Sequence, residues 1–189
     1  DYNYGQITAA WVKRYVEQNG GEVVSTDFFP LDVTNFGPTI SKIQSAKPDM
    51  VMHVLVGTGH LGFLNQWAAA GMKNKIPMAS TTFGAAGADI EIIKPEAANG
   101  VITSYGYYPS IDTPENNAWV AKVKKRYPEK TPFLTELSAF TWDGMMIWAD
   151  AVRTAGSMDR MKLIEVMESG KTYTMPSGKC TIDPKTHHA

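Results

Sequence analysis

Phenol, hydroxyl and glycine residues stand in short stretches of the sequence where they could bind a small polar molecule. Hydroxyl groups donate and accept hydrogen bonds, aromatic rings supply apolar walls, and glycines let the backbone approach a guest closely. Together these residue types predict a binding cleft lined by neutral groups and no centre of covalent chemistry. The candidate ligand-binding residues are Tyr2, Tyr4, Gly57, Thr58 and Thr82.

An alternation of helices and strands is what would bring these residues to one place. The apolar spacing predicts strands at 22–29, 50–56, 76–80 and 101–105, and helices at 7–18, 36–46, 60–70 and 114–126, with a short helical turn at 90–93. This order is typical of an α/β fold with a Rossmann-like open parallel sheet and helices on both faces. Ligands bind such sheets where strands pass into helices, so the candidate residues are expected at one edge.

The pattern changes after residue 127. Two helices follow in succession, predicted at 135–155 and 159–169, and a hairpin is predicted at 173–182 with its turn at Pro176-Ser177-Gly178. Successive helices break the alternation, and their apolar faces need a surface beyond the first 127 residues. We therefore expect these helices to belong to another lobe than the one formed by the first 127 residues. The first helix should likewise be preceded by a parallel strand upstream of Asp1.

Composition excludes several classes of partner. The net charge of −1 and the pI near 6.5 provide no basic field for nucleic acid. The single Cys180 excludes an intrachain disulfide and any metal site built from several cysteines. His187 and His188 have no carboxylate or cysteine at a suitable spacing, so we expect no metal and no cofactor.

Other features have plainer interpretations. His53 lies inside an apolar strand and is expected to be a satisfied core histidine, whereas His60 could face either solvent or the cleft. The two amino-terminal tyrosines could pack at a strand end, and the Gly-Thr-Gly run could be a tight turn only. The sequence contains no Gly-x-Ser-x-Gly run, zinc helix motif or dinucleotide fingerprint, which predicts that the protein is not an enzyme.

Six runs in one order resemble the type I periplasmic binding proteins, and most closely their amide and urea branch. The runs are DYNYG, PLDVTNFGPTISKIQSAKPDMV, VGTG, IPMASTT, GVITSYGYYPSIDTPENNAWV and GKCTIDPKTHHA, and the similarity covers essentially the whole chain. That branch includes the substrate-binding subunits of ABC importers and a cytoplasmic amide sensor.

The resemblance implies a two-lobed clamp that traps a solute by hinge closure. Residues 1–127 would form the second lobe without its first strand, 128–175 would supply helices of the first lobe, and 176–189 would begin the return across the hinge. The chain would then be a fragment, and the missing remainder of the same polypeptide would complete the cleft.

The resemblance also implies a role for each candidate residue. Tyr2 and Tyr4 would be aromatic walls and phenolic donors, Gly57 and Thr58 would form the adjoining loop, and Thr82 would hydrogen-bond the solute.

Amino-acid-binding relatives meet the ammonium group of the ligand with a carboxylate. The loop 80–84 has no carboxylate, and Asp89 comes later, so a neutral amide or urea is the expected ligand. An ammonium group buried without an anionic partner would be costly. The implied partner is a membrane permease and the implied location is the periplasm. The alternatives are a branched-chain amino acid as ligand, or a cytoplasmic regulator that binds another protein.

Overall fold

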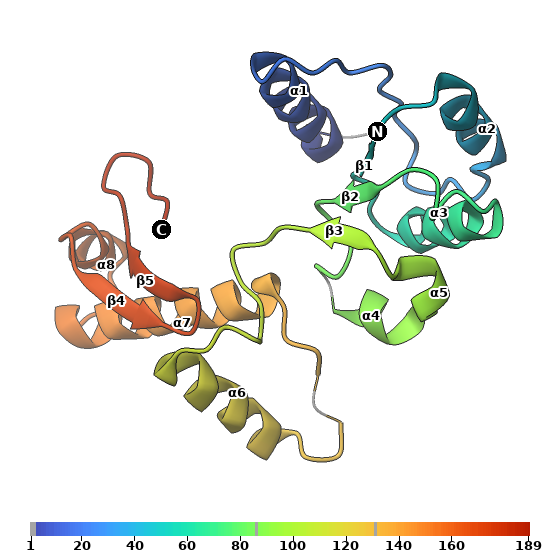
Figure 1. The fold of residues 1–189 in the computed structure, drawn as a ribbon. Coiled ribbons are helices and arrows are strands. Elements are labelled where there is room, and N and C mark those ends of the chain that lie inside the picture. Colours follow the sequence, from blue (N-terminus) through green and yellow to red (C-terminus); the bar gives the residue numbers. More distant parts are fainter. Residues whose placement is uncertain (1–2, 86, 131) are drawn as a thin grey trace. The chain divides into compact units, whose positions relative to one another are not determined.

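A computed structural model describes residues 3–85, 87–130 and 132–189, together with every side chain in these ranges except those of Thr58 and Ala88. The chain divides into two compact units, the first ending at Ser104 and the second comprising Tyr105–Ala189 (Figure 1). The predicted ligand residue Tyr2 lies outside the described residues. No described helix is long and apolar enough to cross a bilayer.

A three-stranded parallel sheet forms the centre of the first unit. Its strands are β1 (Val51–His53), β2 (Met78–Ser80) and β3 (Val101–Thr103), in the order β1-β2-β3. The register aligns the last residue of β1 with the last residues of β2 and β3. The predicted parallel α/β arrangement is therefore confirmed, with strands shorter than the sequence pattern predicts.

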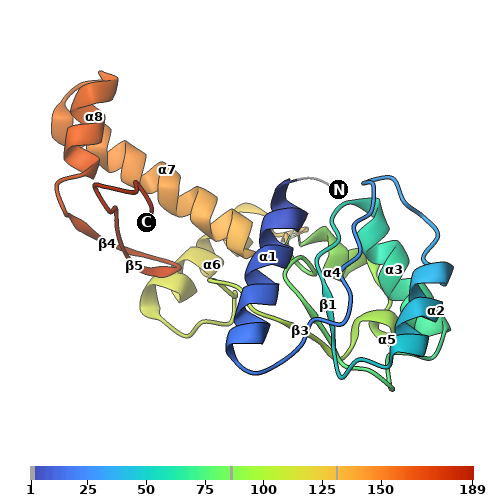
Figure 2. The same cartoon turned by 90° about the horizontal axis from the view of Figure 1, so that it is seen from above.

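Helices cover this sheet and supply its core. They are α1 (Asn3–Gln18), α2 (Gly37–Ala46), α3 (Thr58–Ala69), α4 (Ala88–Ile92) and α5 (Pro95–Ala98). Phe36, Leu64 and Trp67 are almost completely buried at the centre of the core. Figure 2 shows α1 on the opposite side of the strands from α2 and α3. On α1, the side chains of Ile7 and Trp11 remain more than half exposed.

The predicted strand at 22–29 is wrong. These residues form no strand, and among the described residues the sheet contains only β1, β2 and β3. A valine-rich run becomes a strand only when a neighbouring strand pairs with its backbone groups. Val24 and Phe28 stay exposed, and only Phe29 packs against the core.

The second unit is built from three helices and a hairpin, and the sequence predicts each of these elements, although it places the helix 114–126 in the first segment. The elements are α6 (Pro114–Arg126), α7 (Glu136–Ala155), α8 (Arg160–Met167), β4 (Thr172–Met175) and β5 (Gly178–Thr181). Side chains of Thr113, Thr135 and Asp159 cap the amino ends of the three helices. Gly156 ends α7 in the left-handed conformation.

The compact units divide the chain differently from the predicted segments. Trp119 of α6 packs with Tyr107 and Leu134, so α6 belongs to the compact unit that begins at Tyr105. The predicted boundary at 175/176 falls between the paired strands of the hairpin, which keep both sides of it together. The assignment of these segments to two lobes of a larger protein stays a prediction.

Candidate functional site

The candidate site lies in the first unit, at the carboxyl ends of β1 and β2. β1 leads through residues 54–57 into α3, and β2 leads through residues 81–87 into α4. Tyr4 on α1 reaches this edge, where its hydroxyl lies 3.1 Å from the Thr81 Oγ1. Tyr4 is 38% exposed and Thr81 is partly exposed, so this pair offers phenol and hydroxyl groups at the surface.

The amino end of α3 contributes backbone groups to the same edge. Gly57 precedes the helix with φ of 68° and ψ of −151°, and no side chain caps the helix. Only glycine adopts this backbone conformation without strain. The first amide groups of α3 thus lack a side-chain cap at a strand-to-helix loop. Thr58 is also a predicted ligand residue, but its side chain lies outside the part that the structure describes.

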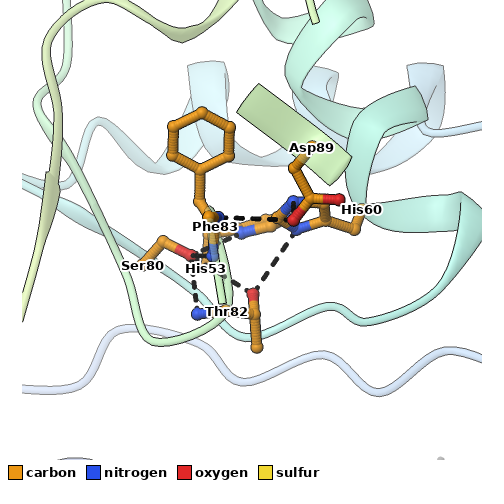
Figure 3. Close-up of polar contacts among 7 residues, drawn as sticks. His53, His60, Ser80, Thr82, Phe83 and Asp89 are labelled. Carbon is orange, nitrogen blue, oxygen red and sulfur yellow. Dashed lines mark hydrogen bonds and ion pairs between the residues drawn. The ribbon is translucent and has the colours of Figure 1, made fainter. Parts of the chain in front are cut away.

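Ser80, the last residue of β2, anchors the loop that follows. Its Oγ accepts hydrogen bonds from the backbone N–H groups of Thr82 and Phe83, at 3.1 and 2.9 Å (Figure 3). The same Oγ lies 3.1 Å from the His53 Nδ1 on the neighbouring strand β1. The conformation of the loop is therefore set by a buried side chain.

The predicted ligand residue Thr82 lies in the interior. It is 8% exposed, and its Oγ1 lies 3.2 Å from the Ser80 Oγ and 3.4 Å from the His60 Nδ1. Its hydroxyl thus has protein partners, whereas the more exposed hydroxyl of this loop belongs to Thr81. Direct contact between Thr82 and a solute stays a prediction.

His60 and Asp89 form the outer part of the polar cluster. The His60 Nε2 lies 3.2 Å from the Asp89 Oδ2, close enough for an ion pair but without the alignment of a hydrogen bond. The same carboxylate oxygen accepts a hydrogen bond from the Gly84 N–H at 3.3 Å. Although the loop 80–84 contains no carboxylate, α4 brings Asp89 back beside it. His60 is 3% exposed, which excludes the solvent-facing alternative.

The two histidines of the cluster favour the neutral form. Burial and, as the smaller cause, the nearby His60 together lower the pKa of His53 to about 3. Burial also lowers the pKa of His60, while Asp89 partly opposes that effect. The His53 ring stacks on Phe63 at a centroid distance of 5.3 Å, as a core residue does. Its Nδ1 has a partner, but its Nε2 has no hydrogen-bond partner among the described residues.

Asp89, His60 and Thr82 lie next to one another in space as a carboxylate, an imidazole and a hydroxyl, which is the arrangement found in acyl-transfer triads. Here, however, the hydroxyl is buried and shared with Ser80. The N–H groups of Thr82 and Phe83 point at the Ser80 Oγ and so cannot stabilise an oxyanion. The arrangement instead makes a rigid support beneath an edge of neutral groups.

Two further features concern thiol chemistry and metal binding. In the second unit, burial raises the pKa of the Cys180 thiol, which keeps it protonated and poorly nucleophilic. Within the described residues, no group of three or more histidine, cysteine or acidic side chains could hold a metal ion.

Sequence reasoning missed Thr81, Ser80 and Asp89 as members of this site. Thr81 could have been found beside Thr82 in the same run of hydroxyl residues, which also contains Ser80. Asp89 had no such signal, because only the turn into α4 returns its carboxylate to Gly84.

Comparisons with known proteins agree in their main result. The family model described as periplasmic binding protein matches residues 1–189. The chain is 29% identical to the Leu/Ile/Val-binding protein homolog 6 of Brucella melitensis over 191 residues, which cover 100% of this chain and 48% of that protein. A shorter match, 33% identical over 90 residues, covers 48% of this chain and 16% of a limonene hydroxylase from Geobacillus stearothermophilus.

A solved structure gives the same result. It is a solute-binding protein of an ABC transporter from Rhodopseudomonas palustris HaA2, in complex with p-hydroxybenzoic acid. The TM-score is 0.84 at 29% sequence identity, and the match covers 100% of this chain and 51% of that one. The chain therefore spans about half the length of the Brucella protein and of the Rhodopseudomonas protein.

Proposed function

Since the chain belongs to the family of type I periplasmic binding proteins, we propose that the whole protein is the solute-binding component of an ABC importer. It captures a small polar solute between two lobes by hinge closure and performs no covalent chemistry. The closed form is recognised by a membrane permease, and the protein works in the periplasm. The family match over residues 1–189 is the main support for this function.

The strand-to-helix edge of the first unit supports the position of the binding surface. The Tyr4–Thr81 hydroxyl pair and the amino end of α3 both lie at the carboxyl ends of parallel strands. In open α/β sheets this is where ligands bind. The surface would form one side of the cleft, and closure would bring the opposite lobe over the solute.

For the solute itself, we favour a neutral amide or urea. Tyr4 and Thr81 both donate and accept hydrogen bonds, as an amide with its C=O and N–H groups requires. Asp89 is the acidic residue beside this loop, and it already pairs with His60 and accepts from the Gly84 N–H. An ammonium group would therefore compete for an occupied carboxylate, at a cost that an uncharged solute avoids.

A solute with a carboxylate group is the second candidate. The amino end of α3 has no side-chain cap, and helix amino ends favour anions. The Rhodopseudomonas relative holds p-hydroxybenzoic acid, and the name of the Brucella relative refers to leucine, isoleucine and valine.

Calorimetry of the full-length protein with acetamide, urea, 4-hydroxybenzoate and leucine separates these candidates. We expect acetamide or urea to bind most tightly. Tyr4→Phe and Thr81→Val should each weaken binding about tenfold, which corresponds to loss of one hydrogen bond of about 1.4 kcal/mol. Tyr15→Phe is the matched control, since Tyr15 lies on the same helix with its side chain 71% exposed. Binding of 4-hydroxybenzoate or leucine alone would replace the amide assignment, and binding of none would contradict the proposed function.

The cytoplasmic alternative makes a different prediction. A regulator on this fold would be synthesised without an export signal and would change its affinity for a protein partner when the solute binds. Fractionation of cells that express the complete gene tests this directly. Recovery in the periplasmic fraction supports the importer component, and recovery in the cytoplasm supports the regulator.

A further inference from the structure

We infer that His60 fixes the direction of the Thr82 hydroxyl, so that Thr82 can only accept hydrogen bonds from a solute and thereby favours solutes with N–H groups. His60 is then a specificity-determining residue that acts through Thr82. The inference rests on the proposed function in one respect, because it assigns the solute to this edge. Which nitrogen of His60 carries the ring proton can be tested without any solute.

The argument begins at Ser80. A hydroxyl oxygen has two lone pairs and one proton. Both lone pairs of the Ser80 Oγ are taken, because it accepts from the backbone N–H groups of Thr82 and Phe83. The Thr82 hydroxyl lies 3.2 Å from this oxygen, but finds no lone pair left there to accept its proton.

The remaining neighbour is the His60 ring. The Thr82 Oγ1 lies 3.4 Å from the His60 Nδ1, and the other ring nitrogen, Nε2, lies 3.2 Å from the Asp89 Oδ2. A neutral imidazole carries its proton on one nitrogen and accepts through the other. A proton on Nε2 faces the negative carboxylate, which leaves Nδ1 free to accept the Thr82 proton. Figure 3 shows Thr82 and Asp89 on different sides of the His60 ring.

Burial keeps this arrangement of hydrogen-bond protons in place. His60 and Ser80 are each 3% exposed and Thr82 is 8% exposed, so water has little access to exchange these bonds. With its proton committed to His60, Thr82 presents only lone pairs. It can accept from the N–H groups of an amide, a urea or an ammonium, but it repels the lone pairs of a carboxylate.

The Leu55 carbonyl defines the competing arrangement, because its interaction with the His60 ring raises the pKa of His60. If the ring proton were on Nδ1, the Thr82 hydroxyl would have to accept from His60, and its own proton would be free for a solute. Long-range proton–nitrogen NMR of the full-length protein with ¹⁵N-labelled histidine distinguishes the two forms at pH 7. His60→Gln assigns the signals. We expect a protonated Nε2 and a bare Nδ1, and a protonated Nδ1 would overturn the inference.

Solute selectivity is the second readout. In His60→Phe the Thr82 proton is released, so the ratio of acetamide affinity to 4-hydroxybenzoate affinity should fall about tenfold, the effect of one hydrogen bond. His60→Gln should restore much of the ratio, because its amide oxygen can accept the same proton. Thr82→Val should weaken acetamide and lose the selectivity in both backgrounds. An unchanged ratio in folded His60→Phe would refute the role of His60. If the wild-type protein binds none of the probes, the proposed function fails while the NMR result still decides the proton order.

Discussion

Acid should destabilise the first unit through His53. This side chain is 3% exposed between Ser80 and Phe63, and burial lowers its pKa to about 3, from an ordinary value of 6.5. The unfolded chain takes up a proton near pH 6.5, while the folded protein does not do so until near pH 3. The unfolded state therefore binds more protons in this window, and stability is lost as the pH falls from about 6.5 towards 3.

The magnitude follows from the same two values. Each pH unit within the window costs about 1.4 kcal/mol per group, so His53 alone should remove about 2 kcal/mol of unfolding free energy between pH 7 and pH 5. Burial also lowers the pKa of His60, which adds to the loss in the same direction. The raised pKa of the buried Asp143 acts in the opposite direction, and this contribution is the same in the wild-type protein and in a His53 variant.

Urea unfolding of the full-length protein at pH 7 and pH 5 measures the effect. His53→Asn keeps a group that can bond Ser80 but does not titrate, so its stability should fall by about 2 kcal/mol less than that of the wild type over this range. His188→Gln removes an exposed histidine of the second unit and is the matched control. Equal pH dependence in the wild type and in His53→Asn would refute the assignment of the acid sensitivity to His53.

Further substitutions test the fold around the site and in the second unit, with urea unfolding as the assay. Gly57→Ala should cost about 1–3 kcal/mol, because alanine is strained at φ of 68° and ψ of −151°; no loss would mean that the turn relaxes. Trp67→Ala should cost about 3–5 kcal/mol, since this ring is 2% exposed in the first core; a cost below 1 kcal/mol would contradict that burial. Tyr107→Phe should cost about 1–3 kcal/mol, because the buried Asn116 Oδ1 loses a donor at 2.7 Å; a neutral result would show that another donor replaces it.

Local signals predicted the helices well. Pro114 at a first turn and the apolar spacing up to Arg126 predicted α6 with the bounds that the structure shows. Thr135 at the start of the long helix is its cap. These features depend on residues within one or two turns of each other, which a sequence displays directly.

Features that depend on distant partners were harder to predict. The run 22–29 has strand composition but lacks a paired neighbour, and composition carries no information on pairing. At the site, Tyr4 was predicted to line the cleft, but its partner Thr81 is separated from it by 77 positions and was not predicted. Asp89 was dismissed for its place in the sequence, although the turn into α4 returns it to the loop.

The polar cluster under the loop 80–84 favours its neutral form. The rings of His53 and His60 lie 5.0 Å apart, so two positive charges would repel each other, and of these two rings it is His60 that lies beside the Asp89 carboxylate. A proton on the His53 Nδ1 would also compete with the backbone N–H groups of Thr82 and Phe83 for the lone pairs of the Ser80 Oγ. These backbone hydrogen bonds hold the loop. A loop held in advance loses less entropy when it meets a solute. The groups that we expect to make the unit sensitive to acid are therefore the same groups that would prepare its edge for the proposed binding.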